Sequence, residues 1–391
     1  MELNTYIKSK KSPDFVLLAI VFALSGFGLA MCYSASAVYA MSTFGDAFYF
    51  FKRQLVWFFA GIVILLTVQA IDYRIYKRYT RPMLIVSFVL LLLVLFPGLG
   101  HHVKGASRWI NFGFFSVQPS EFVKVVIVIY LVKIFSRDRD GNKPGNTVVQ
   151  LLFPLFIVAT MFVLIMLQPD FSTAMTLLFV AAVIFFMSGF PFIYMITLFI
   201  LSIPMFYLLI YQVDYRRERI LAYLDPWKDR FGNGYHIIQS FIAFKKGGLL
   251  GLGMGFGEQK IRRLPEPHTD FIFAVIAEEM GLFGTGLIVI LFCFFFVRIT
   301  SIALAAPDNF GSFLAIGLGV LIVAQAFINI GVVTGGLPTT GIPLPFLSYG
   351  GSSFLSCMLS VGILLNISRY GVEKNRMEKT TKSAAAQEVL M

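Results

Sequence analysis

The feature that most constrains this chain is a series of ten apolar runs spaced along almost its whole length. They cover approximately residues 15–38, 55–71, 83–97, 117–135, 151–167, 172–188, 191–211, 271–297, 311–333 and 346–368. A helix needs about 20 apolar residues to cross a hydrocarbon core about 30 Å thick, and the second, third, fifth and sixth runs are short by that measure. The pattern predicts an all-α polytopic membrane protein with about ten transmembrane helices.

The composition agrees with a membrane protein. Of the 391 residues, 58% are hydrophobic and only 14% are charged, so a water-soluble fold would leave too much apolar surface uncovered. The formal net charge of +11 does not indicate a nucleic-acid partner, because most basic residues lie in short stretches between apolar runs, where they meet membrane lipids. Cys32, Cys293 and Cys357 lie far apart within apolar runs, which favours packing roles.

An even number of spans places both termini on the same side of the membrane. The segments on that side carry most of the bases outside the large loop, which predicts cytoplasmic termini. The predicted layout is a cytoplasmic tail over residues 1–14, a single transmembrane domain over 15–368 and a cytoplasmic tail over 369–391. The first apolar run exceeds the about 7–15 residues of a signal-peptide core, so we interpret it as a retained helix.

One outer segment departs from this charge pattern. Residues 212–267, a large extracytoplasmic loop between helices 7 and 8, carry ten bases: Arg216, Arg217, Arg219, Lys228, Arg230, Lys245, Lys246, Lys260, Arg262 and Arg263. Either these bases bind a polyanion, or they are simply solvated, because long loops translocate whatever their charge. Two other outer segments, 97–116 and 335–351, are rich in helix-breaking residues, and we expect all three to converge on one outward-facing cavity.

Three ionisable side chains lie within or between the apolar runs, where charge is costly and therefore informative. Glu121 and Lys124 are three residues apart on one helical face and are predicted to pair. That pair has either a structural role, holding helices together, or a catalytic one. Asp170 follows a proline at a helix junction, where it either caps the next helix or takes part in chemistry.

The densest group of functional side chains lies where the basic loop enters the eighth helix. It comprises Arg262, Arg263, His268 and Asp270, and the acidic pair Glu278 and Glu279 follows about two turns later. Asp270 is either a helix cap or a general base, since a carboxylate beside arginines suits a phosphorylated substrate. A lone histidine such as His268 is more often structural. One of the two glutamates is expected to pair with a base inside the bundle.

Five stretches resemble a known family, the SEDS proteins (shape, elongation, division and sporulation) of the FtsW, RodA and SpoVE type. They are residues 105–110 (GASRWI), 118–124 (QPSEFVK), 167–170 (LQPD), 265–279 and 341–353 (GIPLPFLSYGGSS), and they follow the family's order across nearly the whole chain. Residues 45–55 and 364–370 look more like the division and sporulation branch. Residues 341–346 and Ala277 are closer to the elongation branch, and on balance the chain looks FtsW-like.

The resemblance implies a peptidoglycan glycosyltransferase that polymerises lipid II into glycan strands at the outer face of the bacterial cytoplasmic (inner) membrane, during cell division or elongation. It also implies a complex with a class B penicillin-binding protein, the transpeptidase, and with other divisome or elongasome proteins. The family's essential aspartate maps onto Asp270. Trp109, Glu121, Lys124 and Asp170 match positions that the family marks as functionally important, and Trp109 provides either a sugar-stacking face or an interfacial anchor.

From these residues we predict that Asp270 is the catalytic general base, which draws a proton from the 4-hydroxyl of an acceptor lipid II. The predicted substrate-binding residues are Arg108, Trp109, Glu121, Lys124, Asp170, Arg262, Arg263 and His268. Arg262, Arg263 and Lys124 would offset charge on the leaving pyrophosphate. The residues assign no cofactor; a divalent cation, Mg²⁺ or Mn²⁺, is an alternative source of positive charge, and its ligands are unassigned.

Two other functions are compatible with these residues. A lipid II flippase would use Glu121, Lys124 and Asp170 as a pathway for the headgroup. The absence of a convincing internal repeat and the concentration of bases on one face argue against alternating access. A scaffold that recruits its transpeptidase is the third function, and it is compatible with catalysis.

Overall fold

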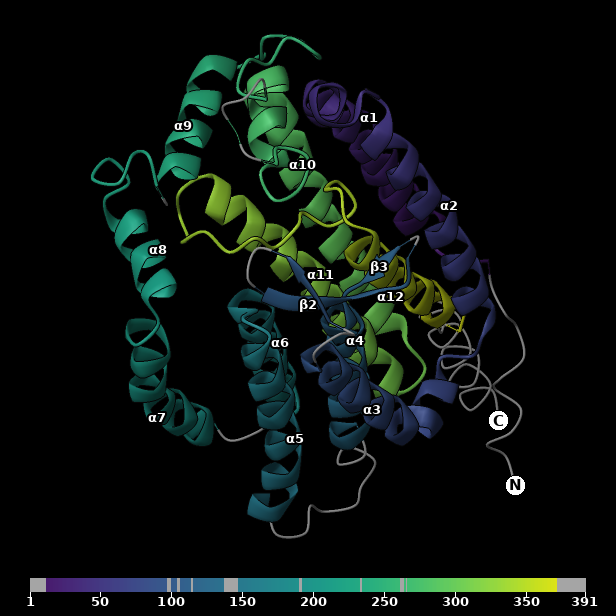
Figure 1. Cartoon of the computed structure of the whole chain (residues 1–391). Coiled ribbons are helices and arrows are strands. Elements are labelled where there is room, and N and C mark those ends of the chain that lie inside the picture. The colour runs from purple at the N-terminus through teal and green to yellow at the C-terminus, as the bar shows by residue number, and fades with distance from the viewer. Residues whose placement is uncertain are drawn as a thin grey trace, which may run out of the picture.

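The computed structural model describes residues 12–96, 100–103, 106–113, 115–136, 147–189, 192–232, 234–260, 264 and 266–370. The described chain is a helical bundle with one small sheet (Figure 1). Before the large loop it forms α1 (Phe15–Phe44), α2 (Tyr49–Ala70), α3 (Arg74–Leu95), α4 (Pro119–Phe135), α5 (Thr147–Leu167), α6 (Phe171–Met187) and α7 (Phe192–Tyr211). After the loop it forms α10 (Ile272–Ala305), α11 (Asn309–Val333) and α12 (Gly351–Arg369).

Each predicted apolar run falls on one of these helices, which confirms the helical membrane fold. In the described chain, seven helices are long and apolar enough to cross a membrane, namely α1, α2, α3, α7, α10, α11 and α12. The residues of α5 from Leu152 to Leu167 and those of α6 form shorter apolar helices, and α4 has 17 residues. With these three shorter helices, the described helices account for all ten predicted apolar runs.

Several predicted spans were shorter than the helices, and α2 and α3 show the physical reason. α2 and α3 are each 22 residues long, whereas their apolar runs cover only 55–71 and 83–97. Both helices begin with a polar turn that contains Lys52 and Arg53 in α2, and Arg74, Lys77 and Arg78 in α3. Apolar runs mark the part of a helix that lies in hydrocarbon, and the helix itself continues into the interface.

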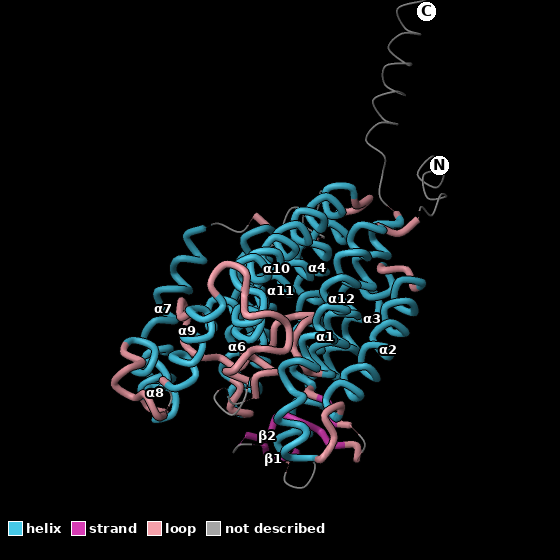
Figure 2. Tube along the Cα trace, turned by 90° about the horizontal axis from the view of Figure 1, so that it is seen from above, coloured by secondary structure: helices cyan, strands magenta, loops and turns pink. Residues whose placement is uncertain are grey.

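The start of α1 and the end of α12 lie together at one end of the bundle, here called the terminal end (Figure 2). There Arg298 donates to Asp14 at 2.7 Å, joining α10 to the start of α1. The Tyr73 hydroxyl and Arg74 Nε donate to Asp308 at 2.8 and 3.2 Å, joining the start of α3 to the start of α11. These charge-assisted contacts connect four helices at the terminal end, α1 with α10 and α3 with α11.

The opposite end, here called the sheet end, carries three antiparallel strands that the sequence did not predict. They are β1 (Gly100–Val103), β2 (Ala106–Asn111) and β3 (Ser116–Val117), in the order β1-β2-β3. The loop over 212–267 also lies at this end and contains α8 (Asp214–Leu224) and α9 (Tyr235–Gly247). Figure 2 shows β1 and β2 at the end of the bundle opposite the start of α1.

α4 lies at the centre of the bundle, against α3, α6, α11 and α12. Its residues from Val123 to Val132 are buried on every face. A helix that is apolar all round is typical of a core position. The two charges in the first half of α4, Glu121 and Lys124, therefore lie inside the bundle rather than at its surface.

α7 and α8 lie on one flank, apart from the other ribbons (Figure 1). None of the described side chains in the most apolar part of α7 is buried, and Phe192, Ile193 and Leu201 are all more than 60% exposed. In a bilayer these side chains contact lipid.

α10, which corresponds to the predicted span 271–297, is not a continuous helix. It is interrupted at Gly281, where φ is 62° and ψ is −159°. Only glycine reaches this backbone region readily, so the helix divides into a short part before Gly281 and a long membrane-crossing part after it. The short part begins directly after Asp270 and Phe271, which makes it part of the candidate site.

Candidate active site

Asp270 lies at the sheet end, in the turn before α10. The capping position of α10 is Phe271, with no side-chain cap, so the structure excludes the helix-cap interpretation of Asp270. The Thr269 hydroxyl donates to Asp270 Oδ1 at 2.9 Å, and Asn329 Nδ2 donates to the Asp270 carbonyl at 2.7 Å. The carboxylate is therefore held in place without being used for local helix capping.

The surroundings of Asp270 favour its protonated form. The side chain is only partly accessible, and desolvation by the surrounding protein raises the pKa of Asp270 above its usual value of 3.8. The hydrogen bond from Thr269 opposes the shift without cancelling it. A raised pKa suits a general base, because catalysis is most efficient when the pKa of the base lies near the operating pH.

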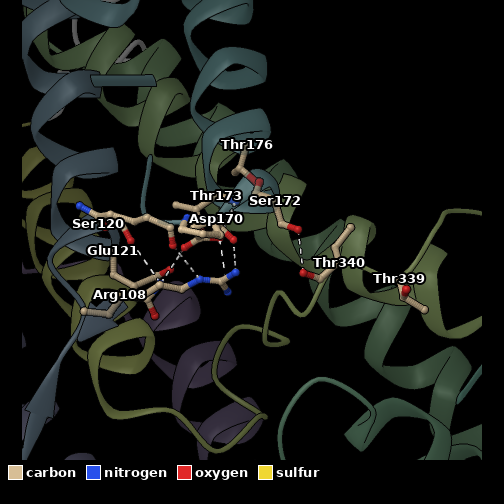
Figure 3. A network of polar contacts seen from close by, with 12 residues as sticks. Arg108, Ser120, Glu121, Asp170, Ser172, Thr173, Thr176, Thr339 and Thr340 are labelled. Carbon is tan, nitrogen blue, oxygen red and sulfur yellow. Dashed lines mark hydrogen bonds and ion pairs between the residues drawn. The ribbon is translucent and has the colours of Figure 1, made fainter. Parts of the chain in front are cut away.

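The segment Thr339–Thr340–Gly341 connects Asp270 with two other elements. Arg219 of α8 donates to the Thr339 carbonyl at 3.4 Å. The Ser172 hydroxyl of α6 donates to the Thr340 carbonyl at 2.7 Å, as Figure 3 shows. A Cβ added at Gly341 would lie 3.8 Å from Asp270 Oδ2. The segment 339–341 therefore contacts α8 and the start of α6, and it lies next to the candidate base.

Asp170 caps α6, as one of its two predicted roles required. Its carboxylate accepts from the Thr173 backbone N–H at 3.3 Å and from Gln118 Nε2 at 2.9 Å. Arg108 points toward it in Figure 3, with Nη1 and Oδ1 3.9 Å apart. The guanidinium also donates to the carbonyls of Gln168 and Pro169.

Arg108 reaches α6 because of a local irregularity in the sheet. In the pairing of β1 with β2, His101 lies opposite Trp109 and His102 lies opposite Ser107, so Arg108 is the additional residue of a β-bulge. Bulges re-aim side chains and are frequent next to functional sites. The side chain of Arg108 is 34% exposed, so part of it stays available to a ligand.

Glu121 and Lys124 form the predicted ion pair. Lys124 Nζ lies 2.8 Å from Glu121 Oε1, and the two side chains are 2% and 5% exposed. Ser356 of α12 donates to the Glu121 carbonyl at 2.9 Å, which ties the start of α4 to α12. This enclosed geometry favours the structural role, and a substrate-binding role of the two residues stays a prediction.

His268 lies in a cluster of aromatic rings. Its ring centroid is 4.1 Å from that of Phe50 and 5.5 Å from that of Tyr349, and its carbonyl accepts from the Tyr349 N–H at 2.8 Å. Burial lowers the pKa of His268 to about 4, so the ring is neutral at physiological pH. The environment favours packing, and a contact of His268 with substrate stays a prediction.

The remaining predicted substrate-binding residues are Trp109, Arg262 and Arg263. Trp109 is half-buried on β2, next to Arg108 in sequence. Arg262 and Arg263 lie outside the described residues. Among the described residues, no group of three or more His, Cys, Asp or Glu side chains has the arrangement of a metal site.

The acidic pair of α10 holds the loop that precedes it. Glu279 forms an ion pair with Lys260 at 2.6 Å and accepts from the Ser34 hydroxyl of α1 at 2.8 Å. Glu278 accepts from the backbone N–H groups of Glu258 and Gln259 at 3.1 and 3.0 Å. These contacts confirm that one glutamate pairs with a base inside the bundle.

Sequence reasoning missed several residues of this region. Gln118 belongs to the same motif as Glu121, residues 118–124. Its hydrogen bond with Asp170 was not predicted, because the two residues are far apart in the sequence. Asn329 and Ser34 are polar residues within apolar runs, and a polar side chain in such a run is the signal that could have found them.

The comparisons with known proteins give the family. The chain matches the FtsW, RodA and SpoVE family, described as "Cell cycle protein", over residues 15–373. It is 43% identical over 370 residues to the probable peptidoglycan glycosyltransferase FtsW of Geobacter metallireducens, covering 94% of this chain and 98% of that protein. It is also 43% identical over 368 residues to stage V sporulation protein E of Bacillus subtilis, covering 92% and 98%.

Comparison with solved structures agrees with the family match. A chain of the structure described as "Structural coordination of polymerization and crosslinking by a peptidoglycan synthase complex" is 29% identical, with a TM-score of 0.76, over 91% of this chain and 98% of that one. The rod shape determining protein RodA of Thermus thermophilus, 24% identical with a TM-score of 0.67 over 93% and 98%, has the same fold. By the family match and by relatives of almost equal length, this multi-pass membrane protein belongs to the FtsW, RodA and SpoVE family.

Proposed function

We propose that this protein is a peptidoglycan glycosyltransferase that polymerises lipid II. The names of its relatives support this activity. The structural observation that carries it is Asp270, a partly accessible carboxylate that caps no helix and is held by Thr269 and Asn329. A neighbouring segment, Thr339–Gly341, is hydrogen-bonded to Arg219, a cation of the large loop.

In the proposed reaction Asp270 accepts the proton of the acceptor's 4-hydroxyl. The acceptor oxygen forms a bond with the anomeric carbon of the growing chain, and the bond from that carbon to undecaprenyl pyrophosphate breaks. The electron pair leaves with the pyrophosphate. A single displacement with inversion needs one base, so one carboxylate at this position is sufficient.

The leaving pyrophosphate needs positive charge. Arg219 and Arg108 are the described cations that contact segments around Asp270 and Asp170. We propose that Arg262 and Arg263, eight and seven residues before Asp270, add to them. A divalent cation would need phosphate oxygens of the substrate as ligands, because the described carboxylates and histidines do not form a three-ligand site.

The proposed location is the bacterial cytoplasmic membrane, with the terminal end in the cytoplasm and the sheet end outside. The bases of the segments at the terminal end support this orientation. It places Asp270 on the outer face, where lipid II carries its sugars. Residues 15–368 then form one transmembrane domain, with cytoplasmic tails over 1–14 and 369–391.

We further propose that a class B penicillin-binding protein is the partner, in the machinery of cell division or elongation. The solved peptidoglycan synthase complex, described as coordinating polymerization and crosslinking, supports a partnership between the two activities. The relatives named FtsW favour division.

A flippase is less well supported by the contacts of the terminal end. Alternating access would require that end to open, yet Arg298 with Asp14, and Arg74 with Asp308, connect its helices by charged hydrogen bonds. Towards the sheet end, Glu279 of α10 is also connected to α1 and to the large loop, through Ser34 and Lys260. Charged contacts near both ends favour chemistry in a bundle that does not alternate between two open states.

The test is polymerisation of lipid II by the purified protein with its transpeptidase partner. We expect Asp270→Ala to lower the rate by at least ~10²-fold, the usual contribution of a general base. Asp214→Ala is the matched control, because Asp214 is an aspartate of the same loop whose side chain is 81% exposed. Normal glycan chains from the Asp270 variant would refute the proposal. Headgroup translocation measured in liposomes with the same preparations would show whether a flippase activity exists instead.

A further inference from the structure

The glycine-rich segment Gly247–Gly257, between α9 and Asp270, alternates glycines with large apolar residues. Its position in a long polar loop suggests a solvent-exposed connection. Its contacts indicate something different, because the segment lies against the interruption of α10.

The backbone of the segment replaces the hydrogen bonds that α10 lacks at Gly281. Leu252 N and Gly253 N donate to the carbonyls of Glu278 and Glu279, at 3.0 and 2.9 Å. In the opposite direction, the N–H groups after Gly281 donate to the segment: Leu282 N to Gly248 O at 2.9 Å and Phe283 N to Leu249 O at 3.1 Å. Backbone groups at membrane depth must be satisfied by protein, and here the segment satisfies them.

Glycine is required for this close approach at two positions. A Cβ added at Gly247 would lie 1.8 Å from the Ala277 carbonyl oxygen, and one added at Gly251 would lie 2.2 Å from the Glu279 carbonyl oxygen. The large apolar side chains of the segment are exposed although its backbone lies against α10. Leu249, Leu250, Leu252, Met254 and Phe256 are 71%, 83%, 44%, 51% and 76% exposed.

These exposed side chains continue a surface that already faces lipid. Leu282 and Phe283, the first residues of the long part of α10, are 61% and 70% exposed, and they are hydrogen-bonded to Gly248 and Leu249. Further along α10, Leu287 and Ile290 are exposed in the same span. Lys245 and Lys246 precede the segment, and basic residues beside apolar ones are typical of elements in the headgroup region.

The depth of the segment follows from two contacts between α1 and α10. Asp14 meets Arg298 at the terminal end, and Ser34 meets Glu279 near the interruption. The 20 residues of α1 from Asp14 to Ser34 rise about 30 Å, which is about the thickness of the hydrocarbon core. If Asp14 and Arg298 mark one boundary of the core, Glu279 and Gly281 mark the other.

We propose that the segment Gly247–Gly257 is a lipid-embedded loop, whose five apolar side chains insert into the boundary between headgroups and acyl chains at the sheet end. Lipid is the occupant of this surface because the surface is continuous with the lipid-facing side of α10 and lies at its depth. The inference does not depend on the proposed reaction.

Nitroxide labels test this directly. Single cysteines at Leu250, Phe256, Leu287 and Lys52 would be introduced into the full chain with Cys32, Cys293 and Cys357 replaced, in phosphatidylethanolamine and phosphatidylglycerol vesicles. Leu287 is the lipid-facing control and Lys52, 67% exposed in the first turn of α2, is the aqueous control. We expect labels at positions 250 and 256 to collide more with oxygen than with a nickel chelate, as at position 287.

Nickel accessibility at positions 250 and 256 matching that at position 52 would overturn the proposal. Protection that arises only when the transpeptidase is added would overturn it as well, because the surface would then belong to a partner. The unsubstituted protein provides a second measurement. Photoactivated phospholipids with a diazirine near the glycerol should crosslink within residues 249–256, and failure to crosslink there while crosslinking α10 would contradict the proposal.

Discussion

The Lys260 ammonium and the Glu279 carboxylate lie 2.6 Å apart, with only 4% and 0% of their side chains exposed. Ser34 completes the group, accepting from Lys260 at 3.0 Å and donating to Glu279 at 2.8 Å. A buried pair of this kind connects α1, the large loop and α10 at the level of the helix interruption. It holds the loop from which the chain continues to Asp270.

Removing one partner of this pair should be strongly destabilising. Lys260→Met leaves the Glu279 carboxylate buried and unpaired, which costs about 3–5 kcal/mol. Lys246→Met is the matched control, because Lys246 pairs with Glu258 at a more exposed site, where such pairs contribute about 0–1 kcal/mol. Thermal unfolding in detergent should separate the two, and Lys260→Met with Glu279→Gln should recover much of the loss. Equal effects of Lys260→Met and Lys246→Met would contradict this account.

Asp270 should limit stability at neutral pH while supporting activity. Its pKa is raised, so between 3.8 and the raised value the folded state binds more protons than the unfolded state, and stability falls as pH rises through that window. Asp270→Asn keeps an acceptor for Thr269 but removes the charge. We expect a higher melting temperature for Asp270→Asn at pH 7, no difference from the unsubstituted protein at pH 3, and loss of polymerisation.

The same shift has a kinetic consequence. The base must be ionised to accept a proton, so the acid limb of kcat/KM for the unsubstituted protein should lie above pH 3.8, the ordinary pKa of an aspartate. A rate profile measured with lipid II across the acidic range checks this. An acid limb at or below the ordinary value would separate Asp270 from the proton transfer.

The contact of the glycine-rich segment with α10 should not tolerate a methyl group. Gly247→Ala would place Cβ within 1.8 Å of the Ala277 carbonyl oxygen, so backbone must move. Gly286→Ala is the matched control in α10, where a Cβ meets nothing within 4 Å and alanine is favoured in a helix by about 1 kcal/mol. We expect lower melting temperature and lower activity for Gly247→Ala, and a neutral or stabilising effect for Gly286→Ala. Comparable behaviour of the two variants would show that the close approach is unimportant.

Capping and charge at Asp170 can be separated by two substitutions. Asp170→Ala removes the acceptor for Thr173 N–H and should cost about 1 kcal/mol of stability. Asp170→Asn retains capping, since asparagine is an equally good cap, but loses the charge facing Arg108. If only the cap matters, the asparagine variant polymerises lipid II normally. If Asp170 positions Arg108 for substrate, that variant folds normally and shows a raised KM.

Much of the fold could be predicted from the sequence because the free energy of moving an apolar run from water into lipid depends on the residues of that run alone. The ten spans, the pairing of Glu121 with Lys124 and the cap at Asp170 all depend on residues within a few positions of one another. The starts of α2 and α3 were predicted too late in the chain, because each helix begins with charged residues that an apolar run does not include. The small sheet and the helices α8 and α9 escaped notice because short elements in a glycine-rich or charged loop have no strong periodicity.

The sequence by itself determined that this chain is a helical membrane protein, where its apolar helices lie along the chain, and which carboxylate lies where the basic loop meets a helix. Only the tertiary structure decided that Asp270 caps nothing, that Glu279 selects Lys260, and that a glycine-rich segment completes the interrupted α10. The free energy of transferring a segment into lipid is a sum over neighbouring residues, so it can be read from the sequence. These contacts, in contrast, join positions far apart in the chain and form only when the helices pack.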